Sequence, residues 1–206
     1  MIRLVVSLIA ITAATPNLAP AQFTGSKTAA TVPAPVKLDT TARFLAVFAR
    51  LGDDLFIAGQ PTERGLRELK AEGVTTVVNL RTPEEMQRIG FDEPALAREL
   101  GMKYVALPVR GNTEYPYSPA TVTRFGDALR GANGKVLLHC TVAWRASHLW
   151  AAYLIRERGV SVDSALANAR AINLMDEHHS GSGPQPVEEF LGRQLPSLRH
   201  SSASYD

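Results

Sequence analysis

Short apolar runs rich in β-branched residues alternate along this chain with segments of helical periodicity. Four runs predict strands, at 55–60, 74–80, 102–109 and 135–140. Apolar residues recur at helical spacing in segments that predict helices at 61–73, 118–131, 146–159 and 161–174, with helical pieces interrupted near Gly90 and Pro94 in between. This alternation is typical of an α/β fold with a central, mainly parallel sheet flanked by helices.

Polar residues mark where several of these helices begin. Thr62, Ser118 and Ser161 stand directly before helical segments, where a side-chain oxygen can accept from an exposed backbone N–H group. Gly73 follows the first helical segment and can end it in a left-handed conformation.

The two ends of the chain differ in composition from its middle. Residues 1–21 combine Arg3, an apolar stretch and an Ala-x-Ala pattern before Gln22, which predicts a cleaved secretory signal peptide. We therefore expect a periplasmic or secreted protein without membrane contact after cleavage, and the intact mass of the exported chain is the check. The alternative is an uncleaved anchor.

The mature chain divides into three expected parts. Residues 22–41 are rich in Thr, Ala and Pro and predict a flexible linker, 42–195 a globular domain, and 196–206 a disordered tail. The 206 residues carry 22 Lys and Arg against 20 Asp and Glu, with no basic or acidic block. This balance gives no indication of a nucleic-acid partner, and we expect a monomer.

The candidate chemistry centres on Cys140, the single cysteine of the chain. It ends the apolar run at 135–140 and precedes a predicted helix, so it lies where a parallel sheet presents ligand-binding residues. The unpaired amides and dipole of a helix N-terminus, together with Arg145, would bind an oxyanion and favour the nucleophilic thiolate. The alternative is a buried, inert thiol.

Two motifs extend this interpretation. The pattern "HC…R" between a strand and a helix, and the segment "LFIAGQP…GVTTVVNLRTPEE", resemble the cysteine-dependent protein tyrosine and dual-specificity phosphatases. Over roughly residues 53–175 the chain is similar to the small bacterial phosphatase-like group that includes the beta-lactamase-hydrolase-like proteins. The resemblance implies a protein tyrosine phosphatase-like fold and hydrolysis of phosphomonoesters through a cysteinyl-phosphate intermediate.

The resemblance also assigns roles to individual residues. It implies that Cys140 is the nucleophile, that Arg145 binds phosphate and that His139 helps to set the loop. The remaining substrate-binding candidates lie in the same loop or at the ends of neighbouring strands: Thr141, Val142, Ala143, Trp144, Ala146, Gln60 and Arg81. For Arg81 a salt bridge with Glu84 or Glu85 is an alternative to a place in the site.

Neither a cofactor nor a metal is expected. The adjacent His178 and His179 would point about 100° apart on a helix, so one ion could not easily take both. The phosphate ester or another oxyanion is the only partner that the sequence suggests.

The chain departs from the phosphatase pattern at several positions. Four residues separate Cys140 from Arg145, where most of these enzymes have five, and Ala143 replaces a loop glycine. If that position requires a positive φ, the extra Cβ costs about 1 kcal/mol. Ala146 replaces a hydroxyl residue.

The expected general acid is also replaced. The segment "LPVRGNTEYPYSP" contains no Asp, so Glu114 is the candidate acid there, or else a solvated loop residue. Tyr115 and Tyr117 in this segment either line the mouth of the site or pack the loop. Two other functions therefore stay open: a rhodanese-like sulfurtransferase with a Cys140 persulfide, and a catalytically weak module that binds anions or phosphoproteins.

Overall fold

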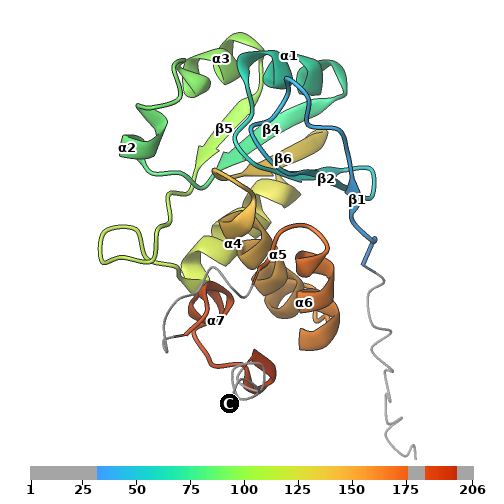
Figure 1. Ribbon diagram of the computed structural model, residues 1–206, viewed down its shortest axis with the longest axis vertical. Coiled ribbons are helices and arrows are strands. Elements are labelled where there is room, and N and C mark those ends of the chain that lie inside the picture. The colour runs from blue at the N-terminus through green and yellow to red at the C-terminus, as the bar shows by residue number, and fades with distance from the viewer. Residues whose placement is uncertain (1–31, 176–183, 199–206) are drawn as a thin grey trace, which may run out of the picture.

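The computed structural model describes residues 32–175 and 184–198, which form a six-stranded sheet with helices on both faces (Figure 1). The expected signal peptide, residues 22–31 of the expected linker, His178, His179 and residues 199–206 lie outside the described residues. Within the described part, no helix is both long and apolar enough to cross a membrane.

The sheet is mixed, and its parallel part contains the strand that leads to Cys140. The strands lie in the order β1-β2-β3-β6-β4-β5. Their bounds are Val36–Lys37, Phe48–Leu51, Leu55–Ala58, Val74–Asn79, Lys103–Ala106 and Lys135–His139 for β1 to β6. β6 runs parallel to both of its neighbours, β3 and β4, and β4 runs parallel to β5, whereas β1, β2 and β3 pair in antiparallel fashion.

The helices form two layers. α1, α2 and α3 (Glu63–Ala71, Pro83–Met86, Glu93–Glu99) lie at one side of the sheet, and the others lie at the opposite side (Figure 1). These are α4, α5, α6 and α7 (Pro119–Arg130, Trp144–Glu157, Val162–Arg170, Pro186–Leu191). Each layer buries its own apolar core against the sheet, with Leu137 of β6 in one core and Leu138 in the other. β6 is therefore buried on both faces, as its unbroken apolar run indicates.

Most of the predicted elements are present, with shifted ends. Thr62, Ser118 and Ser161 cap α1, α4 and α6 through their side-chain oxygens, as expected. The break at Gly90 is present, where φ is +81°, but Pro94 lies inside the first turn of α3 and does not interrupt it. β1 and β2 were not predicted, because each contributes only two or four residues.

The globular body begins before Ala42, contrary to the linker expected at 22–41. β1 lies within that segment and pairs with β2. Val32 packs against the larger core, and Asn168 Nδ2 donates to the carbonyl oxygen of Pro33 at 2.9 Å. At the other end, Pro196–Leu198 forms a 3-10 helix, so ordered structure continues into the expected tail.

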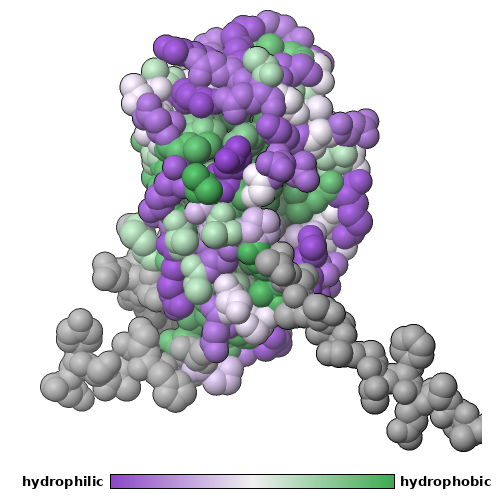
Figure 2. All heavy atoms as spheres, turned by 90° about the vertical axis from the view of Figure 1, so that its right-hand side faces the viewer, coloured by the Kyte–Doolittle hydropathy of each residue, from purple (hydrophilic) through white to green (hydrophobic). Residues whose placement is uncertain are grey.

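The surface away from the carboxyl ends of the parallel strands is mixed in polarity. Figure 2 shows apolar residues across the middle of this face and mainly hydrophilic residues at its upper end, where Figure 1 places α1 and α3.

Candidate active site

The loop that holds Cys140 is fixed to the neighbouring strand. β6 ends at His139, and the backbone N–H of Cys140 donates to the carbonyl oxygen of Ala58, at the end of β3, at 3.3 Å. The N–H of Gln60 donates to the carbonyl oxygen of Thr141 at 2.9 Å. Cys140 is only 1% exposed. The strand and the loop thus hold the thiol in place beneath the surface.

The second half of the loop is held from the other side. Val142 forms an isolated bridge with Gly59, and Asn173 Nδ2 donates to the Val142 carbonyl oxygen. Trp144 begins α5 and donates from Nε1 to the carbonyl oxygen of Met175 at 3.1 Å. The bulky Trp144 thereby anchors the helix start to the segment after α6.

Ala143 occupies the left-handed conformation that the missing glycine would adopt. Its φ is +66° and its ψ is −3°, and it is the N-cap of α5. An alanine has no side-chain oxygen with which to cap the helix, so the first amides of α5 remain available to an anion. Both the N–H and the hydroxyl of Ser147 donate to the Ala143 carbonyl oxygen at 2.8 Å. The hydroxyl of Ser147, the residue after Ala146, therefore holds the loop backbone in place.

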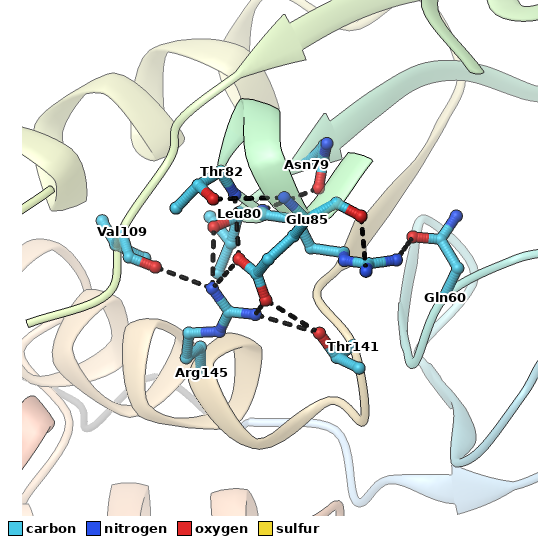
Figure 3. A network of polar contacts seen from close by, with 9 residues as sticks. Gln60, Asn79, Leu80, Thr82, Glu85, Val109, Thr141 and Arg145 are labelled. Carbon is cyan, nitrogen blue, oxygen red and sulfur yellow. Dashed lines mark hydrogen bonds and ion pairs between the residues drawn. The ribbon is translucent and has the colours of Figure 1, made fainter. Parts of the chain in front are cut away.

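Arg145 is held from several directions at once (Figure 3). Its Nη1 donates to Glu85 Oε2 at 2.9 Å and to the carbonyl oxygens of Val109 at 2.8 Å and Leu80 at 3.3 Å. Its Nη2 donates to Glu85 Oε1 at 2.7 Å and to Thr141 Oγ1 at 3.0 Å. The two-point pair with Glu85 fixes the plane of the guanidinium beside the Cys140 loop.

Glu85 is a site residue that the sequence motifs did not identify. The Thr82 N–H donates to Glu85 Oε2 at 2.9 Å, and the Thr82 hydroxyl accepts from the Glu85 N–H, so the capping box of α2 orients the carboxylate. Burial acts to raise the pKa of Glu85, but the contacts with Arg145 and Thr82 lower it to about 2. The sequence signal was Thr-Pro-Glu-Glu at 82–85, which is a capping-box pattern.

A second buried network lies under the loop. His139 Nε2 pairs with Glu93 Oε1 at 2.9 Å, and Glu93 Oε2 accepts from Gln60 Nε2. All three side chains are buried. Burial acts to raise the pKa of Glu93, but the interaction and hydrogen bond with His139 and the hydrogen bond from Gln60 lower it below its usual value. His139 therefore ties the end of β6 to α3.

Arg81 joins the two networks without forming the expected salt bridge. Its Nη1 donates to Gln60 Oε1, and its Nη2 donates to the backbone carbonyl oxygen of Glu85 at 2.9 Å. Neither acceptor is a carboxylate, because Glu85 directs its carboxylate to Arg145. Arg81 is 8% exposed and lies at the end of β4, next to the site.

The structure does not bring Glu114 to Cys140. Glu114 is exposed in the loop between β5 and α4 and forms a hydrogen bond with the Tyr115 hydroxyl. Tyr117 of the same loop lies near enough to Cys140 and Arg145 to interact with them electrostatically. Burial raises the pKa of Tyr117 to about 12. Its ring packs on Phe190 of α7, with 5.0 Å between ring centres. Of the two tyrosines in this loop, Tyr117 is therefore the one that lies near the site.

Two cavities meet at Arg81. One of about 490 Å³ is lined by Gln60, Arg81 and Thr141, and one of about 680 Å³ is lined by Arg81 together with residues of α2, α3 and β5. Within the described residues, His, Cys, Asp and Glu form no cluster suited to a metal ion.

The parallel strands, the cysteine loop between β6 and α5 and the buried arginine define the class of cysteine-dependent phosphatases. Solved structures support the fold. TpbA from P. aeruginosa, in complex with pTyr, is 18% identical, matches 87% of this chain and 99% of its own and has a TM-score of 0.52. PTPMT1 is 19% identical, matches 77% of this chain and 99% of its own and has a TM-score of 0.54.

Residues 49–182 match the family described as DSP-PTPase phosphatase fused to NAD+ kinase, so the chain belongs to that family. A beta-lactamase hydrolase-like protein from Agrobacterium fabrum is 28% identical over 159 residues, which cover 76% of this chain. The match covers 34% of the relative, so the chain spans about a third of its length. The family and the fold confirm the phosphatase-like classification.

The left-handed Ala143 yields a stability prediction. We expect Ala143→Gly to retain or raise the free energy of unfolding, because relief of strain of about 1 kcal/mol offsets the loss of one methyl group. Ala146→Gly is the matched control: it is equally buried but helical, so it should lower that free energy by about 1 kcal/mol or more. Urea unfolding measures both, and equal losses would contradict the strain at Ala143.

The Glu85–Arg145 pair yields a pH prediction. Because folding depresses the Glu85 pKa from 4.5 to about 2, its contribution to stability is complete above pH 4.5 and is lost as the pH falls toward 2. Glu85→Gln should therefore lower the free energy of unfolding by about 2 kcal/mol at pH 7, and the difference in this free energy from wild type should vanish near pH 2.

Glu99→Gln is the control for this measurement, because its ion pair with Arg67 is exposed. Its effect on unfolding should be small at both pH values. A Glu85→Gln difference that persisted unchanged at pH 2 would show that the carboxylate charge does not stabilise the fold.

Proposed function

We propose that this chain hydrolyses phosphate monoesters of the phosphotyrosine or dual-specificity type through a phosphorylated Cys140. One observation carries the proposal: Cys140 and the fixed guanidinium of Arg145 flank a loop that opens onto the uncapped N-terminus of α5. Such an arrangement offers a nucleophile, backbone donors and a planar cation to the same phosphoryl group.

The proposed reaction has two steps. In the first, the Cys140 sulfur forms a bond to phosphorus while the bond from phosphorus to the leaving oxygen breaks. In the second, water attacks phosphorus, the S–P bond breaks and inorganic phosphate leaves with the thiolate restored. The loop amides and Arg145 bind the equatorial oxygens in both steps.

The contacts of Arg145 suit this role. Its Thr141 hydroxyl contact can be exchanged for a phosphoryl oxygen, while the Glu85 and backbone contacts keep the guanidinium in place. A positioned guanidinium needs little reorganisation when charge develops in the transition state.

The position of Glu114 bears on the substrate class. An exposed carboxylate that is hydrogen-bonded to Tyr115 does not protonate a leaving group unless its loop moves. Aryl phosphates depend least on such a proton, because phenolate is a good leaving group. The similarity to TpbA, whose structure contains pTyr, supports the same class.

We expect the protein to release phosphate from aryl phosphates. Cys140→Ser should abolish the reaction, because the hydroxyl is a far weaker nucleophile. Arg145→Lys should lower kcat/KM by about 10²- to 10³-fold, since a point charge cannot replace the two-point contact. Steady-state phosphate release measures both, and Arg98→Lys on the exposed face of α3 is the matched control.

Three outcomes would contradict the proposal. If Arg145→Lys kept the wild-type rate, the arginine would not bind the reacting group. If Cys140 gained a stable sulfur from thiosulfate and no phosphate were released, the protein would be a sulfurtransferase. If it bound oxyanions without turnover, it would be the binding module.

Glu114→Gln tests the general acid. A larger loss of kcat with poor leaving groups than with good ones would place Glu114 in the mechanism.

A further inference from the structure

The cavity of about 490 Å³ beside the Cys140 loop carries an excess of positive charge. Thr141 connects it to the loop, and its wall contains Arg64, Arg81 and Arg88 against one carboxylate, Glu63. Because Thr141 directly follows Cys140, a molecule whose phosphate lies in the loop can extend into this cavity.

The three arginines differ in how far their charges are already satisfied. Arg64 forms an ion pair with Glu68 at 2.6 Å. The side chain of Arg88 has no hydrogen bond or ion pair with any other part of the chain that the structure describes, and it is exposed. Arg88 is therefore free to turn toward an anion in the cavity.

Arg81 is the strongest indication of a ligand. Both of its hydrogen-bonded acceptors, Gln60 Oε1 and the Glu85 carbonyl, are neutral, and its Nε has no hydrogen-bond partner. The carboxylates of Glu85 and Glu93 lie near enough to interact with the charge of Arg81, but neither accepts a hydrogen bond from it. A buried donor without an acceptor is costly, and an anion at this wall would accept from the free Nε–H.

We propose that this cavity is a second anionic subsite, formed by Arg81 and Arg88, and that preferred substrates carry a second anionic group on the body that bears the scissile phosphate. The inference rests on the proposed function, since the first phosphate must occupy the Cys140 loop. A sphere of about 490 Å³ is about 10 Å across, which is room for a ring with an anionic substituent. Leu45, which is 71% exposed, and Phe91 line the same cavity and can contact such a ring.

Two substrates with similar leaving groups test the subsite. These are 3-(phosphonomethyl)phenyl phosphate, whose phosphonate is not hydrolysed, and 3-methylphenyl phosphate. We expect the wild-type protein to favour the first by about tenfold in kcat/KM, mainly through KM, and Arg88→Ala to reduce this preference to about threefold or less. Raising the salt concentration should also reduce this preference in the wild-type protein, because salt screens the charge of the exposed Arg88.

Arg98→Ala is the matched control, since it removes an exposed arginine outside the cavity. It should leave both rates and their ratio unchanged. Equal rates with both substrates in the wild-type protein, or a preference that survives in Arg88→Ala, would overturn the second subsite while leaving the phosphatase function intact.

A binding measurement separates the two proposals if neither substrate is hydrolysed. Calorimetric titration of the wild-type protein with each compound then gives the affinity ratio directly. A tenfold ratio that depends on Arg88 would support the subsite although the proposed phosphatase reaction had failed. Equal affinities would overturn the subsite as well.

Discussion

The bidentate contact between Glu85 and Arg145 is the interaction on which the site depends. It joins α2, at the end of β4, to the first turn of α5, which follows β6. Arg145 also donates to the backbone between β4 and β5 and after β5, so one guanidinium holds three segments of the carboxyl edge of the sheet. The charge is tolerated below the surface because Glu85 offsets it. Although burial acts against the charged form, the Glu85 hydrogen bonds raise the pKa of Arg145.

The sequence predicted the scaffold of the site well, because the scaffold is encoded locally. Val136, Leu137 and Leu138 are successive apolar residues because β6 is covered on both faces, and the caps Thr62, Ser118 and Ser161 precede their helices directly. The placement of Cys140 between a strand and a helix follows from the same local signals. Ala143, which stands in the position of the loop glycine, does have the positive φ that the sequence left as a condition.

The partners of the buried charges could not be predicted in this way. Glu85 and Arg145 are 60 residues apart, and His139 and Glu93 are 46 apart, so no local pattern joins them. The sequence suggested Glu84 or Glu85 as a partner of Arg81, but the parallel pairing of β4 and β6 brings Glu85 to Arg145 of α5 instead. Glu114 was considered because it is the only acid of its segment, whereas the structure places it at the surface.

We expect the Cys140 loop and Arg145 to form a phosphate cradle without rearrangement of the Glu85 pair. A crystal structure of the protein with orthovanadate would show whether they do. We predict vanadium bonded to the Cys140 sulfur, its oxygens hydrogen-bonded to the amides of residues 142–145 and to Arg145, and the Glu85–Arg145 contact retained. An empty loop at saturating vanadate, or an Arg145 that must leave Glu85 to reach the anion, would show that this loop is not a preformed phosphate cradle.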